Sequence, residues 1–308
     1  MLLRLATRGS PLALWQARHV ASLLESAHPG SGLQVELVTV TTAGDRAAQV
    51  PVWEMRGQGV FVGEVQAAVL DGRADAAVHS AKDLQPVEAQ GLVLAATPER
   101  ADPRDALVGC RLSDLGPGSV VATGSQRRRA QLAALRPGLV FESLRGSIAT
   151  RLGRVPPGGA VVVAMAALER LGLSPLPMEV LATEVMLPQV AQGAIAVECR
   201  DGDGEVLGLV EAADHPPTRV AVEAERAFLA SIGGGCDLPV GALAVLRAGE
   251  RLYLEGLLAA PDGNVVVRCS GEGLVSDRVE LGRQVAEAVL AGGGQELLTA
   301  YLRGRGWQ

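Results

Sequence analysis

The first 200 residues alternate short apolar runs with helical patterns, and this alternation constrains the fold more than any other feature of the chain. The first helix is introduced by Ser10 and Pro11, a pair typical of a helix start. The expected elements are strands at Leu2–Ala6, Leu33–Val40 and Ala74–Val78 and helices at about Pro11–Ala27 and Val60–Leu70. Strand–helix–strand units of this kind predict an α/β architecture with a mainly parallel sheet.

A second α/β unit and a different C-terminal pattern follow. The polar stretch Thr97–Asp105 contains two prolines and predicts a linker or hinge. The next unit has expected strands at Ser119–Ala122, Val140–Leu144, Ala160–Ala164 and Ala194–Val197, and helices at Ser125–Leu135, Ser147–Leu152 and Ala166–Leu171. From about Pro216 a helix, three strand-like runs with a turn at Asp262-Gly263-Asn264, and a final long helix predict a small α+β domain.

Composition argues against nucleic acid as a partner. The net charge is -6 and aromatic residues make up only 3%, whereas nucleic-acid binders usually carry a basic surface or stacking aromatics. The four cysteines are far apart and no run approaches the length of a membrane span, so we expect a protein of the reducing cytoplasm without a membrane partner. The start of the chain does not resemble a signal peptide, and no metal-ligand spacing is present.

The segment Val120–Arg129 combines a strand, a Thr-Gly-Ser turn and the start of a helix. Such a turn directs backbone N–H groups and the positive end of a helix toward an anion. Thr123 and Ser125 add hydroxyl donors, and Arg127 and Arg128 add positive charge, although some of the three arginines must point away because successive helical residues lie about 100° apart. A run of three arginines is commonly a solvated helix face, so both interpretations stand, with the turn favouring an anion site.

Three further arginines occupy similar places at element ends. Arg8 follows the first strand, Arg145 follows another, and Arg151 lies in the helix after it. Ligands of open α/β sheets bind at the carboxyl ends of the strands, and arginine suits carboxylates and phosphates. No phosphate-binding glycine motif is present, so nothing specific indicates a nucleotide.

The segment His79-Ser80-Ala81-Lys82-Asp83 follows a strand, where loops commonly carry chemistry. Lys82 is the only lysine among 28 basic residues. An exposed surface ion pair is the ordinary alternative, but the single lysine favours function, because an ammonium differs chemically from a guanidinium. A carboxylate such as Asp83 can transfer a proton and stabilise positive charge.

Cys236 follows three glycines, which allow the backbone to approach another group closely. A cysteine in a glycine-rich loop is a candidate nucleophile or attachment point. A buried inert thiol is the better interpretation for Cys110, Cys199 and Cys269.

Eight motifs in order resemble one family, hydroxymethylbilane synthase, also called porphobilinogen deaminase. They are ATRGSPLALWQA (6–17), HSAKD (79–83), ERADPRDA (99–106), ATGSQRRRAQL (122–132), SLRGSIATRL (143–152), LERLG (168–172), LPQVAQGAIAVECR (187–200) and AERAFLASIGGGCDLPVG (224–241). Together they extend over nearly the whole chain, and their number and order make the resemblance specific.

The resemblance implies two α/β lobes like those of type II periplasmic binding proteins, joined by a hinge, and a small C-terminal α+β domain. The expected boundaries are 1–97 with 193–214 for domain 1, 98–192 for domain 2 and 215–308 for domain 3. The implied enzyme is a transferase of tetrapyrrole (porphyrin and heme) biosynthesis. It joins four porphobilinogens head to tail with release of ammonia, then hydrolyses the chain free as hydroxymethylbilane. The family also implies a monomer.

The resemblance assigns roles to individual residues. Cys236 matches the cysteine that holds a dipyrromethane cofactor by a thioether, and Asp83 matches the catalytic aspartate. Cofactor contacts are expected at Ser80, Lys82, Thr123, Ser125, Arg127, Arg128, Arg145 and Gln192. Substrate contacts are expected at Arg8, Ser10, Gln16, Arg145, Arg151 and Arg170. Every pyrrole carries an acetate and a propionate, which agrees with a cationic cleft in an acidic protein.

The departures of the chain from the family pattern include one loop, and two rival functions remain. Arg56–Phe61 stands where the family has Gly-Gly-Lys-Gly-Leu-Phe, so a loop lysine is missing. A periplasmic-type solute-binding protein would share the two lobes but needs an export signal and has no use for Cys236. A nucleic-acid regulator using Arg127–Arg129 predicts a basic domain, which is absent from the composition.

Overall fold

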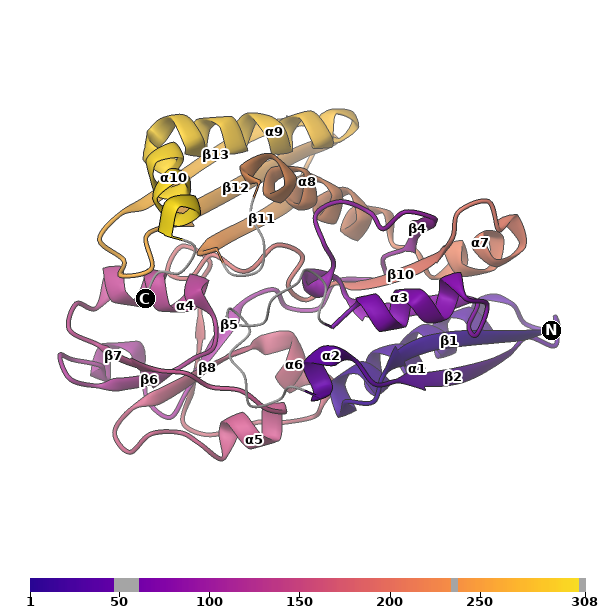
Figure 1. The fold of residues 1–308 in the computed structure, drawn as a ribbon, viewed down its shortest axis with the longest axis horizontal. Helices are drawn as coiled ribbons and strands as arrows, with labels where there is room; N and C mark the ends of the chain where they lie inside the picture. Colours follow the sequence, from indigo (N-terminus) through magenta and orange to yellow (C-terminus); the bar gives the residue numbers. More distant parts are fainter. Residues whose placement is uncertain (47–60, 234–237, 305–308) are drawn as a thin grey trace.

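The computed structural model describes residues 1–46, 61–233 and 238–304. The first lobe is built on a sheet of order β2-β1-β3-β10-β4. Its strands are β1 (Leu2–Arg8), β2 (Gln34–Val40), β3 (Ala76–Ser80), β4 (Leu92–Ala96) and β10 (Ile195–Arg200). Its helices are α1 (Pro11–Ala27), α2 (Ala43–Arg46), α3 (Gly63–Leu70) and α7 (Gly204–Val210). Figure 1 shows this lobe around the N-terminus.

The second lobe repeats this plan with a sheet of order β7-β6-β8-β5-β9. Its strands are β5 (Asp105–Val108), β6 (Val120–Ala122), β7 (Val140–Glu142), β8 (Ala160–Ala164) and β9 (Met178–Leu181). Its helices are α4 (Gln126–Leu135), α5 (Ile148–Leu152) and α6 (Met165–Arg170). The two lobes lie beside one another in Figure 1, and each has its own core of mainly aliphatic side chains.

The sheets are mainly parallel, as expected, but each contains one strand that runs in the opposite direction. β1 pairs in parallel with β2 and β3, and β6 pairs in parallel with β7 and β8. In contrast, β10 is antiparallel to β3 and β4, and β5 is antiparallel to β8 and β9. β5 and β10 are the strands that follow the two crossings between the lobes. β5 and β10 run opposite to the other strands of their sheets, and the periodicity of the local sequence does not show strand direction.

The chain crosses between the lobes twice, from β4 to β5 and from β9 to β10 (Figure 1). The two crossing segments touch, because Ala101 N donates to Gly193 O at 3.2 Å. Gly193 has φ +88, and an added Cβ would lie 2.5 Å from Ala101 O, so the contact requires glycine. The predicted linker at Thr97–Asp105 covers the first crossing, and its last residue already belongs to β5.

A C-terminal α+β unit packs over both lobes. It contains α8 (Pro216–Ile232), β11 (Val240–Arg247), β12 (Arg251–Ala259), β13 (Val266–Leu274), α9 (Arg278–Val289) and α10 (Gln295–Gly304). Its antiparallel sheet buries Phe228 of α8, and Gly256 leaves room for this ring, since a Cβ there would lie 2.3 Å from it. The predicted turn around Gly263 connects β12 and β13, with Gly263 packed against α4.

The buried Glu225 connects this unit to the crossing segments. Its carboxylate pairs with Arg100 Nη1 at 2.6 Å and accepts from Ala191 N at 2.6 Å and Ala244 N at 2.8 Å. A buried charge is tolerated only when paired and hydrogen-bonded, and these contacts provide both. Glu225 therefore fixes α8 and β11 against the junction of the two lobes.

Candidate active site

The turn after β3 carries Lys82 and Asp83 to the junction of the lobes. The chain leaves β3 at Ser80 and forms a single 3-10 turn over Ala81–Asp83. Ala81 N donates to Ala194 O at 3.0 Å, and the side chains of Ser80 and Gln16 are hydrogen-bonded at 3.0 Å. The turn is thus held from two sides, and Gln16 lies beneath it on α1.

A buried acid–base pair lies directly behind this turn. His79 Nε2 is 3.1 Å from Glu198 Oε2, and both side chains are buried. Gln66 Nε2 donates to the same carboxylate at 2.9 Å. Burial opposes ionisation of Glu198, but the contacts with His79 and Gln66 outweigh it, so the pKa of Glu198 lies below its usual value.

Lys82 and Asp83 differ from most charged groups of the chain in having few partners. Both are partly buried. Lys82 Nζ reaches Gln192 Oε1 at 3.5 Å, and no hydrogen bond within the described residues involves the Asp83 carboxylate. Loss of hydration lowers the pKa of Lys82 to about 8, with the negative charge of Asp83 opposing this shift and the positive charge of Arg128 adding to it.

Two arginines of the run at the start of α4 are buried. Ser125 caps α4 by accepting from Arg128 N, and its own N–H donates to Thr123 Oγ1 at 3.2 Å. Arg127 and Arg128 are 3% and 6% exposed, whereas Arg129 is exposed and lies over the Phe141 ring. The expected Thr-Gly-Ser turn and helix start are therefore present, with the run divided between interior and surface.

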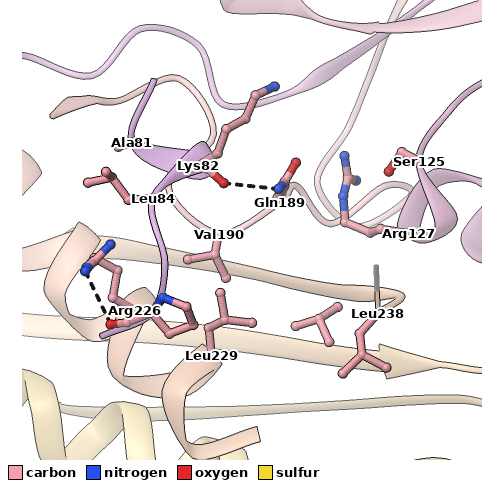
Figure 2. A pocket seen from close by; sticks show the side chains of 12 residues that line it. Ala81, Lys82, Leu84, Ser125, Arg127, Gln189, Val190, Arg226, Leu229 and Leu238 are labelled. Atoms are coloured by element: carbon pink, nitrogen blue, oxygen red, sulfur yellow. Dashed lines mark hydrogen bonds between the residues drawn. The ribbon is translucent and has the colours of Figure 1, made fainter. Parts of the chain in front are cut away.

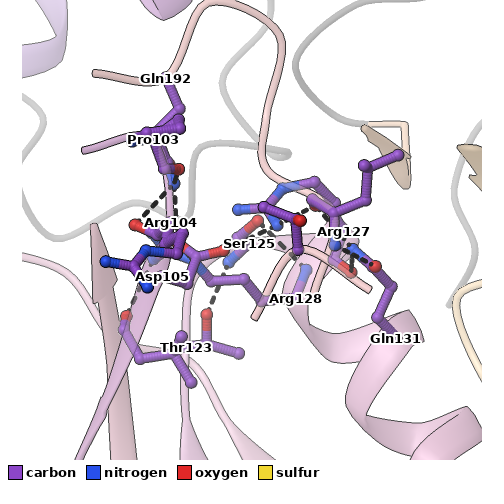
Figure 3. Close-up of polar contacts among 12 residues, drawn as sticks. Pro103, Arg104, Asp105, Thr123, Ser125, Arg127, Arg128, Gln131 and Gln192 are labelled. Carbon is purple, nitrogen blue, oxygen red and sulfur yellow. Dashed lines mark hydrogen bonds and ion pairs between the residues drawn. The ribbon is translucent and has the colours of Figure 1, made fainter. Parts of the chain in front are cut away.

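Asp105, the last residue of the predicted linker, forms ion pairs with both buried arginines (Figure 3). Arg127 Nη1 lies 2.8 Å from Asp105 Oδ2, and Arg128 Nη2 lies 2.7 Å from Asp105 Oδ1. Gln192 Nε2 also donates to Asp105 Oδ1, at 2.9 Å. Burial opposes ionisation of Asp105, but the charges of Arg127 and Arg128 dominate and hold its pKa well below the usual value. A charged residue directly before the apolar run Ala-Leu-Val was the available signal.

A pocket lies where the three units meet (Figure 2). Its wall includes Lys82 and Leu84 from the first lobe, Ser125 and Arg127 from the second, and Arg226, Leu229 and Leu238 from the C-terminal unit. Arg226 donates to Pro86 O at 3.3 Å and so holds the chain after the Lys82–Asp83 turn. Cys236 lies outside the described residues, but Leu238, two positions later, lines this pocket.

Other predicted arginines gather around one aromatic ring. Arg8 lies over Phe61 at 4.4 Å and forms an ion pair with Asp45, and Arg145 lies 6.0 Å from the same ring. Arg151 is held by Gly146 O. Burial lowers the pKa of Arg151 to about 10, and the charges of Arg128 and Arg145 add to this shift while Asp83 opposes it. Arg151 therefore interacts electrostatically with the cations of the second lobe and with the Asp83 carboxylate.

Two predicted substrate residues have other visible partners. Ser10 caps α1 by accepting from Ala13 N. Arg170 of α6 donates to Gly193 O at 2.6 Å and lies over the Trp15 ring at 5.6 Å, beside a second opening at the hinge. The altered loop at Arg56–Val60 lies outside the described residues. Among the described residues, no cluster suits a metal ion and no helix is long and apolar enough to cross a membrane.

Comparisons with known proteins identify the family. The model described as "Porphobilinogen deaminase, dipyromethane cofactor binding domain" matches residues 3–208, and the one described as "Porphobilinogen deaminase, C-terminal domain" matches residues 220–291. The chain belongs to the porphobilinogen deaminase family. A curated porphobilinogen deaminase from Acidothermus cellulolyticus is 46% identical over 97% of this chain and 92% of its own length.

Family membership confirms the resemblance found in the eight motifs, together with the transferase class and the dipyrromethane cofactor. Solved structures resemble the two lobes only distantly. A putative lipoprotein from Ruminococcus gnavus gives a TM-score of 0.41 at 14% identity, covering 69% of this chain and 90% of that one. An arginine-specific periplasmic binding protein from Salmonella typhimurium gives 0.39 at 11%, covering 69% and 91%.

The pocket side chains fit a dipyrromethane. Two linked pyrroles carry acetates and propionates, and carboxylates require cationic or N–H partners when buried. Arg127 Nε and Nη2 are buried and have no hydrogen-bond partner among the described residues, and Lys82 and Ser125 line the same pocket. These groups are donors that the described chain leaves available for ligand carboxylates.

Proposed function

We propose that this porphobilinogen deaminase, a hydroxymethylbilane synthase, joins four porphobilinogens at the junction of its three units, with Asp83 as the catalytic residue and Cys236 as the attachment point. The observation that carries the site assignment is the pocket that brings Lys82, Ser125 and Arg127 beside Leu238. Lys82, Ser125 and Arg127 are residues that bind carboxylates, and Leu238, which lines the same pocket, is two positions after Cys236 in the sequence.

The residues of the two lobes divide the binding of carboxylates. Lys82 from the first lobe and Ser125 and Arg127 from the second would hold the cofactor, with Ser80, Thr123, Arg128, Arg145 and Gln192 nearby in support. When bound, the dipyrromethane supplies the nucleophilic ring carbon to which the next pyrrole is joined. Arg8 and Arg145 at the Phe61 ring, with Arg151, form the second cationic group and would receive the incoming substrate.

Asp83 has the properties that this chemistry needs. Its carboxylate has no hydrogen bond within the described residues, so it is available to a substrate. It belongs to a 3-10 turn that the Gln16–Ser80 hydrogen bond holds in position. As ammonia leaves porphobilinogen, positive charge develops on the pyrrole, and the Asp83 oxygens would stabilise the ring nitrogen and exchange a proton there. Ser10, Gln16 and Arg170 would also contact the substrate, in addition to the bonds they form in the protein.

The organisation proposed with this function has domain boundaries at 97/98, 192/193 and 214/215, a monomeric chain and a cytoplasmic location. These boundaries put each crossing segment between the lobes and begin the third domain just before α8. The porphobilinogen substrate reaches the site as a small molecule from solution, without a nucleic-acid or membrane partner.

Intact-mass spectrometry of the purified chain tests this function. We expect a mass above that of the sequence by two linked pyrrole units. The Cys236→Ser variant is expected to have the sequence mass and no turnover, and Cys269→Ser serves as the matched control that keeps the adduct. An active wild-type protein with the unmodified sequence mass would exclude the attachment of a dipyrromethane.

A further inference from the structure

Arg127 presents two different edges of its guanidinium to its surroundings. Nη1 donates to Leu187 O at 2.7 Å and lies 2.8 Å from Asp105 Oδ2. Nε and Nη2, on the other edge, are buried and have no hydrogen-bond partner within the described residues. The parallel N–H groups of one guanidinium edge are the geometry that a carboxylate accepts in a bidentate pair. This edge is therefore a donor fork that lacks an acceptor in the described chain.

Arg128 has no comparable free edge. Its Nε and Nη2 donate to Asp105 Oδ1 at 3.0 and 2.7 Å, and its Nη1 donates to Val162 O at 2.9 Å. Every nitrogen of its guanidinium thus has a protein partner. The two adjacent arginines therefore differ: Arg128 is hydrogen-bonded to the protein at every guanidinium nitrogen, whereas Arg127 has the Nε and Nη2 edge available for a ligand.

We propose that Asp105 is a positioning residue that holds Arg127 by its Nη1 edge so that the Nε/Nη2 fork receives a carboxylate of the cofactor. Arg128 acts through Asp105, by fixing that carboxylate against β8. The inference rests on the proposed function, because it takes the ligand of the pocket to be the pyrrole carboxylates. It goes further by assigning the specific receiving edge and the residue that orients it.

The same carboxylate also reaches the first lobe. Gln192 Nε2 donates to Asp105 Oδ1 at 2.9 Å and to Pro103 O at 2.8 Å, and Gln192 Oε1 is 3.5 Å from Lys82 Nζ. Asp105 therefore connects, directly or through Gln192, to two of the cations that line the pocket, Arg127 and Lys82. Its removal is expected to disturb the spacing of both, and thus the simultaneous binding of two carboxylates by the two lobes.

Loading of the full-length apoprotein with porphobilinogen tests the proposal, with the adduct measured by intact mass. We expect the Asp105→Asn variant to need about tenfold or more higher porphobilinogen for half-maximal adduct, the loss expected when a charge-assisted hydrogen-bond pair is misplaced. Asp102→Asn is the matched control, because it removes an aspartate–arginine pair of the same crossing segment that involves only Arg104. The control is expected to load like the wild type.

A double variant separates positioning from folding. Asp105→Asn leaves two buried arginines without a counter-ion, so it is expected to lower the unfolding temperature. Adding Arg128→Gln restores the net charge of the cluster but not the hold on Arg127. We expect stability to recover while loading stays impaired. Wild-type loading by either variant would overturn the role of Asp105. Absence of any adduct on the wild-type chain would instead refute the proposed function itself.

Discussion

Two groups of opposite charges meet at the junction of the lobes: the Lys82–Asp83 turn of the first lobe and the Asp105–Arg127–Arg128 cluster of the second. The carboxylates of the two groups differ in the partners that hold them. Asp83 is partly buried and forms no hydrogen bond within the described residues. Asp105 is fully buried and contacts two arginines and Gln192. A carboxylate that must meet a changing substrate keeps its oxygens available, whereas one that orients binding groups has them occupied.

The largest expected effect is the loss of turnover when the Asp83 carboxylate is removed. Asp83→Ala is expected to reduce the rate of ammonia release about 10²- to 10⁴-fold, the usual contribution of a positioned acid or base. Its unfolding free energy should change by less than about 1 kcal/mol, since no described hydrogen bond is lost. Steady-state kinetics and denaturant unfolding measure the two quantities. Full activity in this variant would remove Asp83 from catalysis.

At Asp105 we expect the main effect of removing the carboxylate to be a loss of stability. Asp105→Ala leaves Arg127 and Arg128 buried without their counter-ion and is expected to cost about 3–5 kcal/mol of unfolding free energy. Urea denaturation of this variant beside Asp83→Ala shows the contrast directly. Equal stability of the two variants would contradict the distinction between the regions.

A pH titration tests whether the charge of Lys82 in the first lobe assists binding. Its pKa of about 8 means that the ammonium is charged below that pH and neutral above it, whereas an ordinary lysine stays charged to about pH 10. Adduct loading of the apoprotein should therefore fall severalfold between pH 7.5 and 9. Lys82→Arg, which keeps its charge, should flatten this fall. A pH-independent wild-type profile would show that the Lys82 charge does not assist binding.

The smallest effect is expected at Arg129. This side chain belongs to the same arginine run but is exposed and contacts only the Phe141 ring among the interactions described. Arg129→Ala should change the unfolding free energy by about 1 kcal/mol or less and leave adduct loading unchanged. A loss of loading comparable to that of Arg127→Ala would mean that the run acts through its total charge, and not through specific positions.

The sequence predicted most of the helices and strands because each follows its own periodicity and start signal. The helix Pro11–Ala27 and the strand Ala160–Ala164 agree with the structure to the residue. β4, β5 and β9 were not predicted, and the antiparallel direction of β5 and β10 depends on the two crossings, which leave no mark in local periodicity. These features belong to the tertiary arrangement of the chain.

The candidate site was predictable where function leaves unusual residues in one short segment. Lys82 and Asp83 stand out as neighbours, and the Thr-Gly-Ser turn stands out before its arginines. Asp105 did not, because its partners Arg128 and Gln192 are 23 and 87 positions away and its own segment looks like a polar linker. The unequal availability of the Arg127 and Arg128 guanidinium edges likewise appears only when the lobes are folded together.

The most direct test of the division between a reacting carboxylate and a binding cluster is the intact mass of the Asp83→Asn protein before and after addition of porphobilinogen. We expect this variant to carry the two-ring adduct and to add further rings at least about a hundredfold more slowly than the wild type, whose mass rises in one-ring steps. Ring addition at the wild-type rate by Asp83→Asn would contradict this division.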